Sequence, residues 1–64
     1  MLVMTDAEQL KALQGKVLLT AKLLRNMAAA LVERYERTAV PGYLYFAQQC
    51  GYHADDLEKA ARNG

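Results

Sequence analysis

The residue types best suited to chemistry lie in one short segment, which holds the chain's one cysteine and one histidine. Cys50 and His53 are three residues apart, so on a helix they share a face. Such a pair can form an activated nucleophile or half of a metal site. No third ligand or orienting group follows at a suitable spacing, and the sequence therefore favours Cys50 as a small hydrophobic core residue.

Two further candidates for chemistry, Asp55 and Asp56, follow directly. Adjacent helical residues point about 100° apart, so these carboxylates do not form an acid–base pair, and we expect them to cap a last helix. The chain contains no serine and no glycine-rich phosphate loop. Its 64 residues leave little room for a ligand pocket, which is typically about 300 Å³ or larger. We therefore expect no enzymatic activity, no cofactor and no bound metal.

The elements that position these residues are expected to be α-helices, because the chain has 11 Ala and 10 Leu but only seven Val plus Thr. Alanine and leucine favour helix over strand. Thr5-Asp6-Ala7-Glu8 has the form of a capping box, which begins a helix. Nothing ends this helix before Pro41, which cannot continue a helical ladder. The first helix is therefore predicted over about residues 6–38, with a length of about 50 Å.

A second helix is predicted to begin at the Pro41-Gly42 corner, because proline suits the first helical position. It covers about residues 42–62 if it continues through Gly51. Alternatively, Gly51 splits it near residues 51–53 into helices over 43–50 and 54–62. In both cases the sequence predicts a single all-α domain over residues 1–64, a helical hairpin with a long N-terminal helix and a shorter second one.

Apolar residues of the first helix follow a seven-residue repeat and also border it on both edges. A helix with one partner needs an apolar stripe of about 100°, but here apolar residues cover much more of the circumference. We therefore expect helix 1 to pack against helix 2 and against helix 1 of a second copy, giving a dimeric helical bundle. The predicted dimer interface comprises Leu10, Leu13, Val17, Leu24, Met27, Leu31 and Val32.

Charge and hydropathy narrow the class of partner. The net charge is +1, and the basic residues are too dispersed for a dense phosphate-binding cluster. The chain begins without the basic region of a signal peptide. Its most apolar window, residues 17–32, is shorter than the ~20 residues of a membrane span and contains charges. We expect a cytoplasmic protein, in keeping with an unpaired cysteine, and neither nucleic acid nor a membrane as its partner.

All five aromatic residues lie within 18 residues around the Pro-Gly corner. In one interpretation they close the hairpin, and in the other the tyrosines contact a target protein, because tyrosine is enriched at binding hot spots. Tyr43 and Tyr45 would point ~200° apart on a helix, so at least one of them should be exposed. The residues assigned to a partner protein are Tyr35, Tyr45 and Tyr52.

The leading functional hypothesis is a small non-enzymatic interaction module that acts as a regulator, inhibitor or chaperone-like adaptor. It would associate with itself and bind a target protein through its helix faces and tyrosines. A lower-ranked hypothesis is an interfacial membrane helix over residues 10–37.

The alternative in a different class is a dimeric DNA-binding transcriptional regulator. Ala47, Gly51 and Leu57 have the spacing of a helix-turn-helix. Three carboxylates in the would-be recognition helix argue against it, because DNA affinity comes largely from neutralising phosphates. The phosphate contacts in this alternative would come from Lys16, Lys22 and Arg25.

The plan of a capped long helix, a Pro41-Gly42 corner, a shorter helix and an aromatic cluster resembles several groups of small helical-hairpin proteins. Among them are small chaperones of type III secretion and phage-encoded proteins that bind and inhibit host factors. The resemblance implies a hairpin fold and an interaction role. No motif in the chain is specific to either group, so no residue role is carried over.

Overall fold

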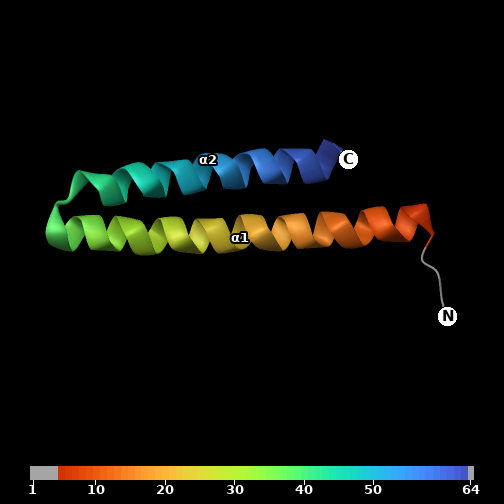
Figure 1. Ribbon diagram of the computed structural model, residues 1–64, viewed down its shortest axis with the longest axis horizontal. Helices are drawn as coiled ribbons and strands as arrows, with labels where there is room; N and C mark the ends of the chain where they lie inside the picture. Colours follow the sequence, from red (N-terminus) through yellow and green to blue (C-terminus); the bar gives the residue numbers. More distant parts are fainter. Residues whose placement is uncertain (1–4, 64) are drawn as a thin grey trace.

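The computed structural model describes residues 5–63, which form two α-helices joined by a two-residue connection. Helix α1 spans Asp6–Thr38 and helix α2 spans Pro41–Asn63. The two helices run antiparallel and side by side, and the N-terminal end of α1 projects beyond the end of α2 (Figure 1). The all-α helical hairpin predicted from the sequence is confirmed.

The start of α1 is fixed by the predicted cap. Thr5 Oγ1 accepts a hydrogen bond from the Glu8 backbone N–H at 3.2 Å, and the Thr5 carbonyl accepts one from the Gln9 N–H at 2.9 Å. Asp6 and Glu8 lie in the first turn, where the helix dipole favours negative charge. Local sequence chemistry is therefore sufficient to define this end of the helix.

The corner between the helices consists of Ala39 and Val40. Ala39 adopts a left-handed conformation with φ 55° and ψ 23°, and its N–H donates to the Tyr35 carbonyl at 2.7 Å. This contact closes the last turn of α1. Pro41 then opens α2, where its fixed φ suits a first helical position and its missing N–H leaves no donor unpaired.

Helix α2 is continuous through Gly51, which decides between the two predictions for this segment in favour of an unbroken helix. A Cβ at Gly51 would meet no atom within 4 Å, and the backbone there has no positive φ. Residues 47–57 therefore form one helix and lack the turn of a helix-turn-helix. The prediction that Asp55 and Asp56 cap a last helix is wrong, because no helix begins there.

Small residues line the interface between the helices. Among residues 5–63, the buried hydrophobic residues are Ala21, Ala47 and Ala54, with 1%, 5% and 0% of their surface exposed, and no large side chain is fully buried. The less exposed residues of α1 alternate in steps of three and four, which is the face turned toward α2. That face comprises Gln14, Val17, Ala21, Leu24, Ala28, Leu31 and Tyr35.

Two polar contacts define the register of the hairpin. Gln14 Nε2 donates to the Ala61 carbonyl at 3.1 Å, and Arg25 Nη2 donates to Asp55 Oδ1 at 2.6 Å. In this register three large side chains on the interface face of α1 lie at about the height of an alanine of α2. These pairs are Val17 with Ala61, Leu24 with Ala54, and Leu31 with Ala47. Alternation of large and small residues lets the two helices interdigitate.

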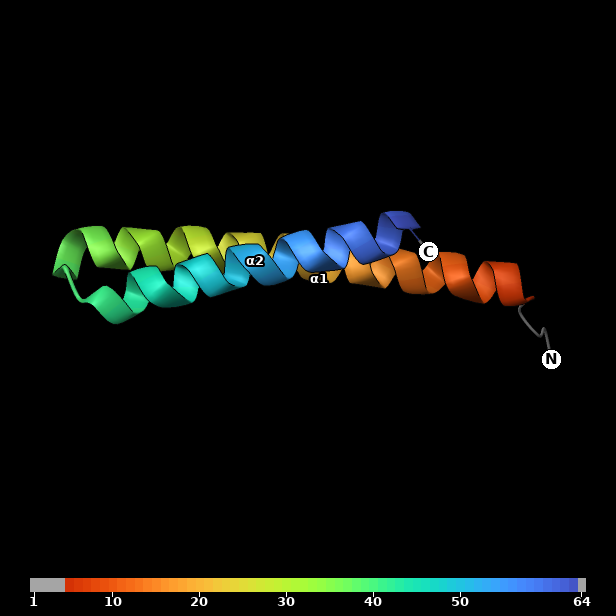
Figure 2. The ribbon, with the colours of Figure 1, turned by 90° about the horizontal axis from the view of Figure 1, so that it is seen from above.

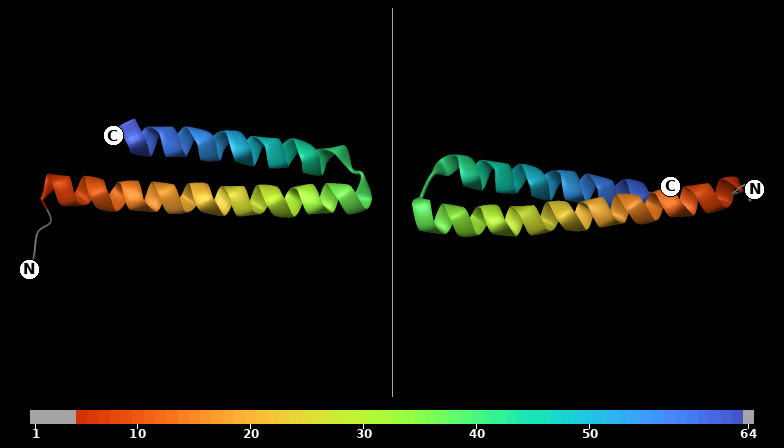
Figure 3. Two further views of the ribbon diagram at one scale, coloured as in Figure 1. Left: turned by 180° about the vertical axis from the view of Figure 1, so that it is seen from behind. Right: turned by 60° about the horizontal axis from the view of Figure 1, so that its bottom comes forward.

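The hairpin is a rod rather than a globule. Its principal extents are 53 × 24 × 11 Å and its radius of gyration is 15.7 Å, whereas a compact domain of this length would have a radius of gyration of about 11 Å. The view from above and the two further views show a single layer of two helices, with no other described element over either broad side (Figures 2 and 3).

Candidate interaction surfaces

The side chains that border the interface between α1 and α2 fall on two sides of the hairpin. At about 100° per residue, Leu18 and Met27 lie roughly 90° from the centre of the interface face of α1, in opposite directions. Leu18 is on the same side of α1 as Arg25. Because Arg25 contacts Asp55 and Glu58, these two residues lie on the same side of the hairpin in α2. We call this side the ion-pair flank and the opposite side the apolar flank.

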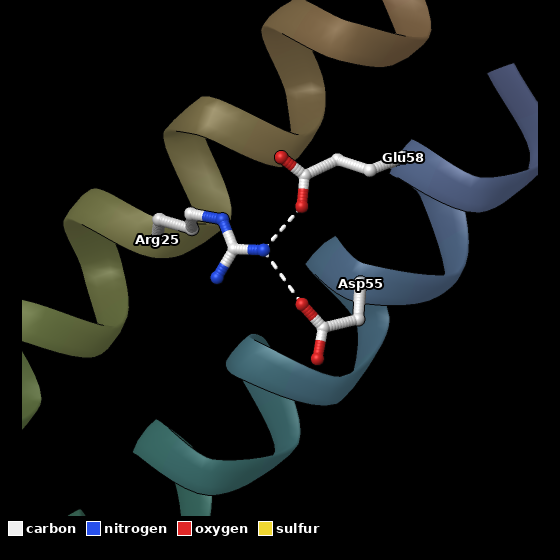
Figure 4. Close-up of polar contacts among 3 residues, drawn as sticks. All are labelled: Arg25, Asp55 and Glu58. Atoms are coloured by element: carbon white, nitrogen blue, oxygen red, sulfur yellow. Dashed lines mark hydrogen bonds and ion pairs between the residues drawn. The ribbon is translucent and has the colours of Figure 1, made fainter. Parts of the chain in front are cut away.

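The ion-pair flank carries a three-residue charge cluster that joins the two helices. The ion-pair flank as a whole comprises Leu18, Arg25 and Val32 of α1, and Leu44, Gly51, Asp55, Glu58 and Arg62 of α2. The Arg25 Nη2 atom donates to Asp55 Oδ1 at 2.6 Å and also to Glu58 Oε1. Figure 4 shows both carboxylates, one helical turn apart on α2, converging on the same nitrogen.

This cluster pairs Arg25 with two carboxylates without burying it. Hydrogen bonds to Glu58 and then to Asp55 raise the pKa of Arg25 above its ordinary value. The Arg25 and Asp55 side chains are 47% and 59% exposed, and ion pairs in such contact with water add little stability. The contact therefore serves mainly to fix the antiparallel register of the helices.

The apolar flank exposes large hydrophobic side chains from both helices. Leu13, Leu23, Met27 and Phe46 are between 54% and 58% exposed. None of its members carries a carboxylate. Lys16 and Arg34 also lie on this flank, since Lys16 is seven residues before Leu23 and Arg34 is seven residues after Met27. Their long stems allow the charged heads to reach water. The flank comprises Leu13, Lys16, Thr20, Leu23, Met27, Ala30 and Arg34 of α1, and Phe46, Cys50, His53, Leu57 and Ala60 of α2.

The residues predicted for a dimer interface occupy different surfaces of the hairpin. Val17, Leu24 and Leu31 are half-buried on the face turned toward α2 of the same chain. Leu10 continues that face but is 46% exposed, because α2 ends before reaching it.

The three other predicted dimer residues lie outside the interface face. Leu13 and Met27 belong to the apolar flank. Val32 lies on the ion-pair flank and is 36% exposed. The hairpin thus brings only two of the seven predicted residues together on a large free surface.

The tyrosines assigned to a partner protein are also separated. Tyr45 and Tyr52 are 57% and 61% exposed, and their spacing of seven residues places both on the side of α2 turned away from α1. The Tyr45 ring meets the Phe46 ring edge to face, with centroids 5.5 Å apart. Tyr35 is half-buried at the corner end of the interface.

The candidates for chemistry are placed on the same helix. Cys50 is half-buried on the apolar flank, and His53 is exposed one turn later. Within residues 5–63, no cluster of three or more His, Cys, Asp or Glu side chains could hold a metal ion, and no pocket is found. No helix in this part of the chain has the length and apolar character to cross a membrane.

Sequence reasoning did not anticipate the ion pairs of Arg25 or the role of Phe46 in an apolar flank. A signal for both exists in the sequence, since Ala47, Ala54 and Ala61 recur every seven residues. This repeat identifies the face of α2 that meets α1. Once that face is set, Asp55 and Glu58 fall on one side of it and Phe46 falls on the other.

Comparison of the chain with protein-family models, with curated proteins and with solved structures finds no match in any of the three. The case for a function therefore depends on the chemistry of the chain's own residues.

Proposed function

We propose that this chain is a non-enzymatic protein–protein interaction module that associates with itself and binds a target protein, acting as a regulator, inhibitor or chaperone-like adaptor. It works in the cytoplasm, where its single thiol stays reduced. Its means of action is occupation of a surface by helix faces and exposed tyrosines, a common mode of recognition for helical partners.

The observation that carries this proposal is the contrast between a very small core and a large apolar exterior. Three alanines form the buried hydrophobic core of residues 5–63, while eleven large hydrophobic side chains are at least 36% exposed. Full burial of one large apolar side chain contributes about 1.5–3 kcal/mol of favourable free energy. Four of the eleven exposed side chains, Leu13, Leu23, Met27 and Phe46, gather on the apolar flank, and an exposed apolar patch of this kind is typical of a protein that binds other proteins.

The tyrosines support contact with a target protein. Tyr45 and Tyr52 are the most exposed of the chain's described tyrosines, at 57% and 61%, and they lie one heptad apart on the outer side of α2. Tyrosine offers a large apolar ring and a polar tip at a low cost in conformational entropy. Tyr35 is half-buried in the interface and contributes to the hairpin instead.

Self-association is tested by light scattering coupled to gel filtration at tens of micromolar. We expect a mass near twice the 7.1 kDa of the chain. A single species of 7 kDa at these concentrations would contradict the self-association part of the proposal.

Target binding is tested by capture from the native cell or host on immobilised protein. The double substitution Tyr45→Ala and Tyr52→Ala should abolish capture of partners held by the wild type while leaving the mass unchanged. The matched control is Gln48→Ala with Gln49→Ala on the same helix, which should retain capture. Equal capture by both double variants would remove the tyrosines from the proposal.

A further inference from the structure

We infer that a second copy of this chain covers the apolar flank, and that the ion-pair flank stays exposed to solvent, so that two hairpins form a four-helix bundle. This inference rests on the proposed self-association and specifies which surface carries it. The juxtaposition behind it is that Met27 of α1 and Phe46 of α2 lie on the same uncovered side of the hairpin.

The spacing of the flank residues favours another pair of long helices as the occupant. On α1, Leu13, Thr20 and Met27 recur every seven residues. On α2, Phe46, His53 and Ala60 do the same. Side chains seven residues apart form a row along one side of a helix, and the large apolar members of these rows, Leu13, Met27 and Phe46, suit contact with another helix that packs alongside over several turns. A second copy supplies two such helices with the same repeat and the same length.

The exposed area matches what such a dimer needs. The chain exposes 5288 Å², whereas a folded monomer of this mass exposes about 4,100 Å². The difference of roughly 1,200 Å² is spread over the whole rod, and burial of the ~800 Å² that each partner contributes to a standard interface would bring the exposed area close to that of a compact monomer. A two-fold dimer uses one surface of the chain twice, so a single flank is sufficient.

Charge distinguishes the two flanks as candidates for burial. The guanidinium of Arg25 and the carboxylates of Asp55 and Glu58 occupy the middle of the ion-pair flank, and covering them would remove water from three charged groups. The middle of the apolar flank holds Met27 and Leu57, whose burial is favourable. The second copy is therefore assigned to the apolar flank.

The test compares Met27→Lys with its matched control Leu18→Lys. The two side chains are 54% and 46% exposed in the single hairpin, and they lie on opposite flanks, so neither substitution disturbs the interface between α1 and α2. Sedimentation equilibrium should show self-association weakened about a hundredfold or more by Met27→Lys, because a two-fold interface meets the substitution twice. Leu18→Lys should change it less than about threefold, as expected for a charge outside the interface.

Footprinting of the wild type keeps the inference testable if Met27→Lys fails to fold. Hydroxyl radicals should modify Met27 and Phe46 in dilute protein and leave them protected at high concentration, whereas Tyr45 and Tyr52 should react at both. Dissociation by Leu18→Lys alone, or equal reactivity of Met27 and Tyr45 at high concentration, would overturn the assignment to the apolar flank but leave self-association in place. A monomeric wild type would overturn both.

Discussion

The two flanks of the hairpin are built from the same two helices, yet one exposes charged groups to water and the other exposes large apolar side chains. On the ion-pair flank, a cation of α1 contacts two carboxylates of α2. On the apolar flank, Leu13, Met27 and Phe46 stand more than half exposed. The first flank pairs its charges within one chain, whereas the second leaves its large apolar side chains in contact with water.

Under the proposed self-association, the two flanks divide the tasks of folding and association within a chain of 64 residues. Exposed charges remain hydrated and need no cover, so a few of them can fix the register of two helices. Apolar side chains contribute to stability only when they are buried, by about 25 cal/mol per Å². Among residues 5–63, the buried residues of the hairpin's own interface are alanines, and many of the larger side chains stay exposed to water.

The largest effect on the free energy of unfolding is expected for a substitution at the alanine-lined interface between α1 and α2. Ala54 is fully buried, so Ala54→Leu should lower the free energy of unfolding by about 1–3 kcal/mol through overpacking. The matched control is Ala29→Leu at an exposed position of α1 outside the helix interface and the apolar flank, which should stay within about 0.5 kcal/mol. Thermal unfolding followed by circular dichroism measures both, at about 4–8 °C per kcal/mol.

An equal melting temperature for the two alanine variants would contradict the division of the hairpin into two flanks. It would mean that α2 does not turn Ala47 and Ala54 toward α1, and the division into flanks would lose its reference face. The expected result is instead a clear fall in the melting temperature for Ala54→Leu alone.

The elements of the fold could be predicted from sequence because strong local signals mark them. Thr5 and Glu8 define the start of α1, and Pro41 defines the start of α2. Gly51 was the ambiguous point, since glycine can end a helix or be tolerated within one at a cost of about 1 kcal/mol. Tertiary packing of the alanines on either side of it decides in favour of a continuous helix.

The surfaces were harder to predict than the helices. The leucines of α1 form a broad apolar band, and hydropathy does not say which of them face α2. The heptad pattern formed by Val17, Leu24 and Leu31 fits a dimer interface as well as it fits an interface within the hairpin. The alanine repeat of α2 distinguishes the two uses, because small residues must oppose large ones when helices pack closely.

A smaller effect of opposite sign is expected for Gly51→Ala on the ion-pair flank. A methyl group there meets no atom within 4 Å, so the substitution should stabilise the fold by about 1 kcal/mol through helix propensity. Gly15→Ala within α1, which is equally open, should give a similar gain. Urea unfolding at fixed protein concentration measures both, and the oligomeric mass should not change.

Gly51→Ala also separates the two functional classes weighed from the sequence. Loss of stability or of helix content would indicate that the chain needs a turn near residue 51, as a helix-turn-helix would. A gain equal to that of Gly15→Ala would support a continuous α2 in solution.

The smallest effect is expected at the charge cluster itself. Arg25→Met removes both interhelical ion pairs and should lower the melting temperature slightly at low ionic strength. In 1 M NaCl, where the Debye length falls to about 3 Å, most of this difference should disappear. Lys22→Met is the control, because it removes the same charge from α1 and Lys22 forms no ion pair with residues 5–63.

The pH dependence of the Arg25 contribution follows from the raised pKa of the guanidinium. A raised folded-state pKa gives stability that is present below the unfolded-state pKa and is lost only as the pH passes the folded-state value. Arginine stays protonated throughout the accessible range, so the difference between wild type and Arg25→Met should be unchanged from pH 7 to pH 10.

Arg25→Met also makes the ion-pair flank more apolar, which brings the two flanks closer in character. Leu18 and Val32 lie seven residues to either side of Arg25, so the variant also gives this flank an apolar seven-residue repeat. We expect the oligomeric mass to rise above that of the wild type, because the charge of Arg25 no longer keeps a second contact from forming on that flank. An unchanged mass would mean that something other than seven-residue apolar spacing selects the surface for a second copy.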